Sequence, residues 1–178
     1  MSNINIGWEE WVSLPKLGLP ALISKTDTGA QTSALHAFNI QPFGSEKKPK
    51  VRFGINPIEG NEQFSIYCSA DVVDVRTITS SNGISELRYV IETSVVIGEV
   101  TRNIEITLTN RENMKYKMIL GRSALDGFTV QPEKSFEQPL LSYDLYKNIK
   151  KQMPARRSLR IAVLTLEPNN YSTRRIVE

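Results

Sequence analysis

Residues 25–37 have the sequence KTDTGAQTSALHA, and the fold is decided around this stretch. The apolar residues just before it predict a buried strand that delivers Asp27 to its end, where catalytic groups are commonly displayed. Asp27 can give or take a proton, Thr28 offers a hydroxyl to neighbouring backbone, and Gly29 lets the chain turn closely under the carboxylate. A short helix-capable run rich in alanine and leucine follows. Asp-Thr-Gly therefore suits acid–base chemistry, although an Asx-type turn at a strand end uses the same residues.

A second stretch lies far downstream, at residues 117–125, and has the sequence KMILGRSAL. It predicts an apolar strand over 118–120 that ends at Gly121, followed by a helical turn over 123–126. Elsewhere, many short segments with strand character are separated by turn signals, and residues 43–49 are expected to form a loop. This pattern is typical of an all-β barrel or sandwich.

The order of these motifs resembles that of the retropepsins, the half-size aspartic proteases. Five longer strings resemble one branch of them, the retropepsin-like family often labelled "putative ATP-dependent zinc protease". These strings are GWEEWV at 7–12, KTDTGAQTSALHA at 25–37, RYVIET at 88–93, LTNR at 108–111 and QPEKSF at 131–136. The resemblance covers roughly residues 5–139. It implies an all-β, closed retropepsin-like (acid protease) barrel with a short C-terminal α/β appendage.

The resemblance also implies an aspartic-type endopeptidase that works as a homodimer. Aspartic proteolysis needs two carboxylates that share one proton, because like charges about 3 Å apart cannot both ionise. The chain contains a single Asp-Thr-Gly, so each copy would contribute its Asp27 across a twofold axis. Thr28 would tie the two loops together and Gly29 would allow their close approach. Ala30 would help to floor the site for substrate, and Gly121 would let its strand pass beneath the aspartate loop.

The clearest hairpin of the sequence spans residues 72–96, because Asn82-Gly83 is the residue pair preferred in a tight turn between strands. In a retropepsin, the hairpin at this place in the order is the flap that closes over substrate. The resemblance therefore implies that Ser81, Asn82 and Gly83 contact substrate. An ordinary surface hairpin over 77–88 accounts for the same residues equally well.

The composition is that of a soluble globular protein of one domain: 178 residues, of which 40% are hydrophobic and 23% charged. No apolar run is long enough to span a membrane, no secretory leader is visible, and Cys68 has no internal disulfide partner. A cytoplasmic protein is therefore expected. The formal charge of +3 is uneven, since residues 147–178 hold eight basic and two acidic side chains. This tail could contact nucleic acid, and a solvated linker explains it at least as well.

The character of the chain changes after residue 139. Helical spacing is expected over 142–151, with Leu141, Leu145 and Ile149 on one face, so residues 140–157 are predicted to be a helix and a basic linker. Residues 158–178 resemble the opening strand and helix of RimK-type ATP-grasp ligases, which add glutamate to protein C-termini. This similarity implies a longer fusion, or a remnant of one, with a RimK-type ligase as domain or partner.

No metal or other cofactor is expected, despite the word "zinc" in the family label. A hydrolytic zinc site usually has three protein ligands with recognisable spacing, whereas this chain has one histidine, His36, and one cysteine. His36 is expected to pack or cap beside the aspartate loop. Three functions remain: an aspartic peptidase, perhaps acting on glutamate-tailed proteins; a catalytically silent peptide-binding module serving a RimK-type ligase; and a nucleic-acid binder. The last lacks a recognised motif and is the weakest.

Overall fold

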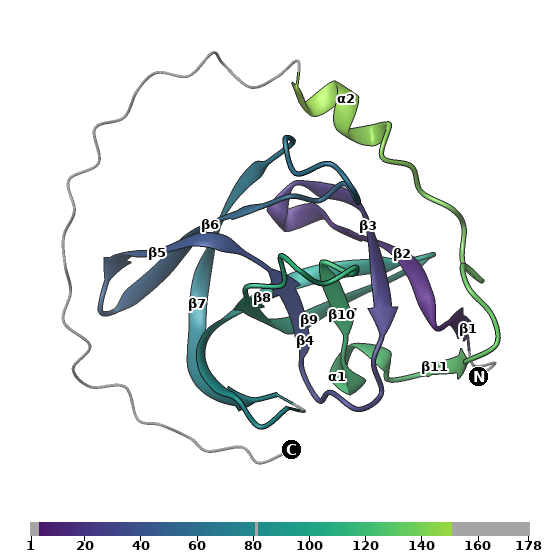
Figure 1. Ribbon diagram of the computed structural model, residues 1–178, viewed down its shortest axis with the longest axis horizontal. Coiled ribbons are helices and arrows are strands. Elements are labelled where there is room, and N and C mark those ends of the chain that lie inside the picture. The colour runs from purple at the N-terminus through teal and green to yellow at the C-terminus, as the bar shows by residue number, and fades with distance from the viewer. Residues whose placement is uncertain (1–3, 81, 151–178) are drawn as a thin grey trace.

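The computed structural model describes residues 4–80 and 82–150, which are mostly β-strand (Figure 1). The strands alternate buried and exposed side chains, as in β2, where Glu10, Val12 and Leu14 are buried and their neighbours are half-buried. The elements in chain order are β1 (Ile4–Gly7), β2 (Glu9–Leu14), the 3-10 turn η1 (Pro15–Leu17), β3 (Leu19–Thr26), β4 (Ser33–His36), β5 (Phe38–Ser45), β6 (Lys48–Ile55), β7 (Ile66–Thr79), β8 (Ser85–Ile97), β9 (Val100–Thr109), β10 (Met118–Leu120), α1 (Arg122–Leu125), β11 (Phe128–Gln131) and α2 (Leu145–Lys150).

Six of these strands close into a barrel, in the order β2-β3-β10-β4-β9-β8. The barrel is closed by the pairing of β2 with β8, where Ser13 lies opposite Val96. Strand β10 runs parallel to β3 and antiparallel to β4, so it lies between the two strands that flank the Asp27 loop. The predicted all-β closed barrel is confirmed.

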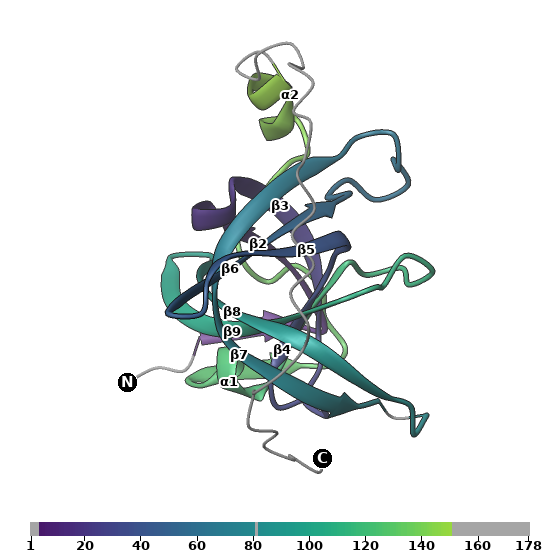
Figure 2. The same cartoon turned by 90° about the vertical axis from the view of Figure 1, so that its left-hand side faces the viewer.

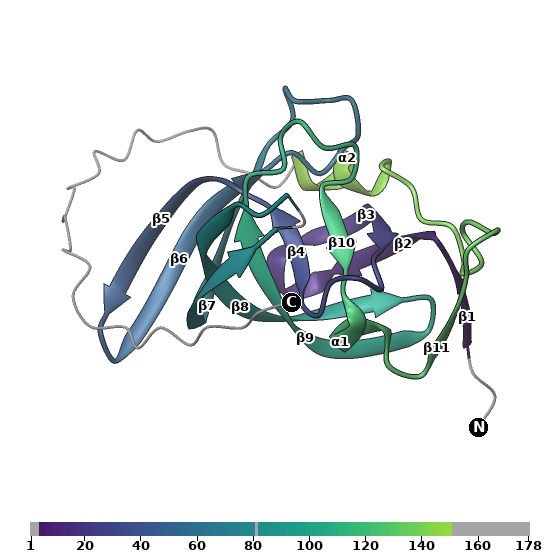
Figure 3. The ribbon, with the colours of Figure 1, turned by 60° about the horizontal axis from the view of Figure 1, so that its bottom comes forward.

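Beyond the barrel, the sheet continues from β8 through β7 and β6 to β5. Strands β5 and β6 form a long hairpin that projects away from the barrel (Figure 3). The prediction of a loop over residues 43–49 is therefore wrong: Phe43 pairs with Lys50 and Ser45 with Lys48, and the turn is confined to the two residues between the strands. The charged sequence, which also contains Gly44 and Pro49, resembles a loop because this hairpin is largely exposed.

The helix-capable run after the aspartate loop is also a strand, β4. All four of its residues, Ser33 to His36, are buried, because β4 lies between β9 and β10 inside the sheet. Tertiary pairing on both edges overrides the helix propensity of Ala34 and Leu35. The helical spacing expected over 142–151 corresponds to the shorter helix α2, whose anchor is the buried Tyr146, whereas Leu145 is exposed.

The segments at the two ends of the barrel domain are tied together. Strands β1 and β11 form a parallel two-stranded sheet. Beside it, the carboxylate of Glu10 is fully buried and accepts hydrogen bonds from the backbone N–H groups of Gly7, Glu137 and Gln138, at 2.9, 2.7 and 3.4 Å. Within the described residues, no helix is long and apolar enough to cross a membrane.

Candidate active site

The Asp27 loop follows the end of β3 and is held by β10 and α1. The N–H of Asp27 donates to the carbonyl of Leu120 at 2.9 Å, and the N–H of Gly29 donates to Asp27 Oδ1 at 3.0 Å. From α1, Arg122 Nη1 donates to the carbonyl oxygens of both Thr28 and Gly29, each at 3.0 Å. The carboxylate of Asp27 is therefore oriented by its own loop, and hydrogen bonds to Leu120 and Arg122 hold the loop in place.

Gly121 makes this fastening possible, because the chain after β10 passes directly against the end of the loop. A Cβ on Gly121 would lie 2.6 Å from the carbonyl carbon of Thr32 and 2.8 Å from the carbonyl oxygen of Gln31. The N–H of Gly121 donates to Ser33 Oγ at 3.1 Å. The glycine is needed here for space rather than for a left-handed backbone conformation, which supports the expectation that the 117–125 stretch passes beneath the loop.

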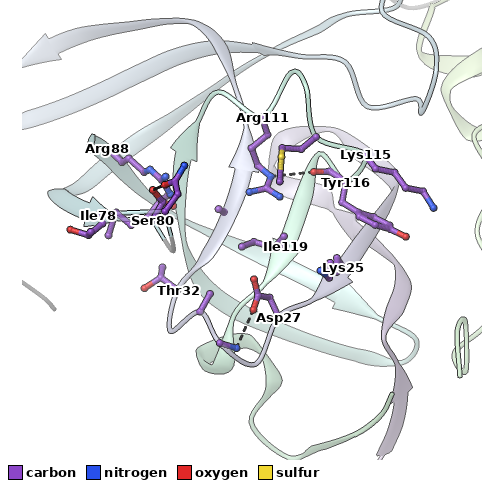
Figure 4. Close-up of a pocket in the computed structure, with 17 residues that line it drawn as sticks. Lys25, Asp27, Thr32, Ile78, Ser80, Arg88, Arg111, Lys115, Tyr116 and Ile119 are labelled. Atoms are coloured by element: carbon purple, nitrogen blue, oxygen red, sulfur yellow. Dashed lines mark hydrogen bonds between the residues drawn. The ribbon is translucent and has the colours of Figure 1, made fainter. Parts of the chain in front are cut away.

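Asp27 faces a pocket of about 700 Å³. Its floor includes Asp27, Thr32 and Ile119, one wall comes from the β7–β8 hairpin, and the opposite wall comes from the loop between β9 and β10 (Figure 4). Figure 2 shows the hairpin and this loop projecting from the same side of the barrel. The predicted hairpin over 72–96 is confirmed, with Thr79 opposite Ser85 at its last pair.

The site residues named from the sequence are only partly gathered at this pocket. Asp27, Gly29, Ala30 and Asn82 line it. Thr28 is exposed at the loop surface and does not line the pocket. Gly83 is exposed in the hairpin turn with a φ of 79°. Ser81 lies outside the described residues. Their roles toward substrate stay predictions.

Sequence reasoning missed the basic residues of the pocket, of which Arg111 is the most constrained. Its Nε donates to the carbonyl of Tyr116 at 3.1 Å, and its backbone N–H donates to Nδ1 of the buried His36 at 3.0 Å. Burial lowers the pKa of Arg111, the nearby Arg88 lowers it further, and Asp27 acts in the opposite direction. The LTNR string at 108–111 contained the signal, but nothing in it showed that Arg111 faces Asp27.

His36 was expected to pack or cap beside the aspartate loop, but its ring caps the loop between β9 and β10 through Arg111. Burial lowers its pKa to about 4, with Lys117 and Arg111 adding to the effect and Glu112 opposing it, so the ring is neutral and its Nδ1 can accept the Arg111 N–H. Cys68 is also buried, which raises the pKa of its thiol to about 12. In the part of the chain that the structure describes, no three His, Cys, Asp or Glu side chains are grouped as metal ligands.

A closed β-barrel that presents an Asp-Thr-Gly loop over a β-strand ending in Ile-Leu-Gly, under a long hairpin, defines the retropepsin-like class. The chain belongs to the RimB-like family, described as "retropepsin-like aspartic endopeptidase RimB", whose pattern matches residues 5–140.

Relatives that match nearly the whole chain are much longer proteins. The chain is 43% identical over 178 residues to a protein of Shewanella pealeana and 42% identical over 178 residues to one of Parasynechococcus marenigrum, both named "Probable alpha-L-glutamate ligase". The matches cover 97% and 99% of this chain but 38% of each relative. A crystal structure of a Legionella pneumophila protein of unknown function is similar with a TM-score of 0.61 and 28% identity, covering 76% of this chain and 98% of that one.

Proposed function

We propose that the chain is an aspartic-type endopeptidase whose active site forms between the Asp27 side chains of two copies. The observation that carries the proposal is the geometry of the loop: Asp27 is oriented by the Gly29 N–H, fastened to Leu120, and directed into a pocket under a hairpin. One carboxylate cannot act as both base and acid in the same step. The chain has a single Asp-Thr-Gly, so the second carboxylate comes from a second copy.

In this reaction a water lies between the two carboxylates. The ionised Asp27 takes a proton from the water as its oxygen attacks the peptide carbonyl carbon, and the protonated Asp27 stabilises the developing oxyanion. A proton is then returned to the amide nitrogen as the C–N bond breaks. Thr28 would meet the partner loop, Gly29 would permit the approach, and Ala30 would support substrate. Asn82 and Gly83, with Ser81 between the described segments, would cover the substrate from the hairpin.

The substrate class we propose is the glutamate-tailed protein, with a RimK-type ligase as domain or partner in the cytoplasm. The support is the naming of the relatives, which are called probable alpha-L-glutamate ligases and exceed this chain in length. The predicted RimK-like stub at 158–178 and the predicted basic linker before it lie outside the described residues. The domain limits 5–139, 140–157 and 158–178 are therefore part of the proposal.

A second candidate is a catalytically silent module that binds glutamate-tailed peptides for the ligase. It is favoured by the presence of only half a carboxylate pair in one chain. In this case the same pocket would bind a peptide chain without cleaving it. The first candidate predicts that the chain hydrolyses peptides and the second predicts that it does not. Comparing the wild type with a variant that lacks the Asp27 carboxylate distinguishes them.

The test is the hydrolysis of a peptide library by the wild type and by Asp27→Asn. In a homodimer the substitution changes both carboxylates of the pair. We therefore expect kcat/KM to fall by at least about 10²- to 10⁴-fold. Folding should be kept, because the Asn carbonyl can still accept the Gly29 N–H. Asp126→Asn is the matched control, since Asp126 also precedes a glycine but is exposed and does not line the pocket. Activity that survives Asp27→Asn and is abolished by a chelator would refute the aspartic mechanism.

A further inference from the structure

Two arginines enter the Asp27 pocket from different elements. Arg88 comes from β8 in the hairpin wall, and Arg111 comes from the loop between β9 and β10 in the opposite wall. Figure 4 places both across the pocket from Asp27, with Ile119 between Arg111 and Asp27. The side chain of Arg88 is only 14% exposed, and Arg111 is half-buried. Neither side chain is therefore an ordinary solvated surface cation.

Each arginine is positioned by a hydrogen bond from its Nε, which leaves its terminal nitrogens able to bind a ligand. Arg88 Nε donates to Glu86 Oε2 at 2.8 Å, and Glu86 Oε2 also accepts the hydroxyl of Thr109 at 2.8 Å. Arg111 Nε donates to the Tyr116 carbonyl at 3.1 Å. Among the described residues, neither guanidinium makes a hydrogen bond through its terminal nitrogens. Both side chains are thus held in place with unused donors directed at the pocket.

The charge around these donors is unbalanced. Of the described residues, four cationic side chains line the pocket together with one carboxylate, that of Asp27, which the proposed reaction uses. The cationic residues are Lys25, Arg88, Arg111 and Lys115. Glu86 partly compensates Arg88 but is 44% exposed, and no carboxylate of residues 4–80 or 82–150 lies within hydrogen-bond distance of Arg111. Arg88 lowers the pKa of Arg111, which indicates that the two guanidinium groups repel each other across the pocket. An anion between them would relieve this repulsion.

We propose that Arg88 and Arg111 together bind a carboxylate of the substrate beside the bond that is cleaved, and so act as specificity-determining residues of this site. The planar fork of arginine matches a carboxylate better than it matches an amide. Because the pair shares the pocket with Asp27, the acidic side chain that it binds belongs to a residue close to the scissile peptide. The inference rests on the proposed function for its substrate, but it assigns roles to residues that the function alone does not require.

The test compares two fluorogenic decapeptides that differ only in four consecutive residues, which are glutamate in one and glutamine in the other. The measured quantity is the ratio of their kcat/KM values for the full chain. Losing a hydrogen bond to an ionised partner lowers kcat/KM by roughly 10- to 100-fold. We therefore expect the wild type to cleave the glutamate peptide with a kcat/KM at least about tenfold higher than that of the glutamine peptide. Peptides with single Glu→Gln changes should locate the preference at one or two positions next to the cleaved bond.

Arg88→Gln and Arg111→Gln should each lower the glutamate preference, measured as the ratio of the two kcat/KM values, by about tenfold or more. If both arginines hold one carboxylate, the double variant should lose less than the product of the two single effects. Lys115→Gln removes the same charge from an exposed side chain at the rim of the same pocket, and it should change the preference less than about threefold. A thermal melt checks that each variant is folded. If Arg111→Gln does not fold, the glutamate preference of Arg88→Gln alone tests the proposal.

The outcomes separate this inference from the proposed function. Cleavage of both decapeptides at equal rates would overturn the arginine pair and leave the peptidase standing. Folded arginine variants that keep the wild-type preference would do the same. If the wild type cleaves neither peptide, the peptidase fails, and the ratio of dissociation constants for the two labelled peptides becomes the measurement. A glutamate preference in binding that both arginine variants abolish would then support the pair, and equal binding would overturn it.

Discussion

Gly121 lies so close to Thr32 that a Cβ on the glycine would be 2.6 Å from the threonine carbonyl carbon. This contact joins the two sequence stretches from which the fold was predicted, since Thr32 ends the aspartate loop and Gly121 directly follows β10. The obstruction is backbone, which cannot rotate away as a side chain can. The relationship therefore explains why Ile-Leu-Gly accompanies Asp-Thr-Gly in this chain.

Gly121→Ala should accordingly destabilise the fold, by about 1–3 kcal/mol, as overpacking of a tight interior does. Gly29→Ala is the matched variant within the same loop. A Cβ there would meet only Asp27 Oδ1, at 3.2 Å, so stability should change by less than about 1 kcal/mol while peptidase activity falls. Urea unfolding followed by fluorescence, together with a peptide assay, checks both. Equal stability of Gly121→Ala and the wild type would contradict the close approach.

Glu10 should be worth more to stability than its neighbour Glu9. Its buried carboxylate accepts three backbone N–H groups from the two ends of the barrel domain, whereas Glu9 is half-buried and accepts the hydroxyl of Tyr116 at 2.7 Å. Glu10→Gln replaces a charged acceptor by a neutral one and adds donors with no partner. We expect a loss of about 1.5–3 kcal/mol, against about 1 kcal/mol or less for Glu9→Gln. Equal losses of unfolding free energy for the two variants in a urea titration would show that the three hydrogen bonds to Glu10 add no extra stability.

The observed fold differs from the one expected from the sequence at particular residues, and these show what a sequence can predict. An all-β fold was predicted because strand alternation is local, and the closed barrel was expected because the Asp-Thr-Gly and Ile-Leu-Gly stretches resemble those of the retropepsins. The strand β4 was missed because Ala34 and Leu35 are good helix formers, and only burial between β9 and β10 makes them extended. Arg111 was missed because its position depends on His36, which is 75 residues away in the chain. Local pattern predicted the elements, and long-range packing determined which side chains share the pocket.

His36 predicts a loss of stability on acidification. Its pKa is about 4 in the folded chain and about 6.5 in the unfolded chain, so between these values the unfolded state binds more protons. Stability should therefore be unaffected by His36 above pH 6.5, should fall as the pH decreases toward 4, and should lose on the order of 3 kcal/mol in total.

His36→Asn removes this titration and keeps an acceptor for the Arg111 N–H. The variant should start with lower stability, because the buried ring is lost, but the difference from the wild type should shrink as the pH falls from 6.5 to 4. Urea unfolding of both proteins at several pH values measures this difference, in which the contributions of the carboxylates cancel. A difference that stays constant across the range would mean that His36 keeps an ordinary pKa.

The last prediction concerns where the barrel domain ends, for which the sequence indicated residue 139. Tyr146 lies beyond this limit, yet its ring is 2% exposed and packs edge-on against Phe64. Its hydroxyl donates to the carbonyl of Ala21 at 2.6 Å. A chain ending at residue 139 should consequently be less stable than one ending at 150, although both keep every strand of the barrel.

Three single variants separate the contributions of this anchor. Tyr146→Phe leaves the Ala21 carbonyl without its partner and should cost about 1 kcal/mol, while Tyr146→Ala also opens a cavity and should cost about 3–5 kcal/mol. Leu145→Ala is the control, since Leu145 is 43% exposed and should change stability by less than about 1 kcal/mol. In a thermal melt, 1 kcal/mol corresponds to roughly 2–4 °C for a chain of this size. Equal melting temperatures for the chains ending at 139 and 150 would place the boundary at 139, and a lower one for the shorter chain would extend the domain through α2.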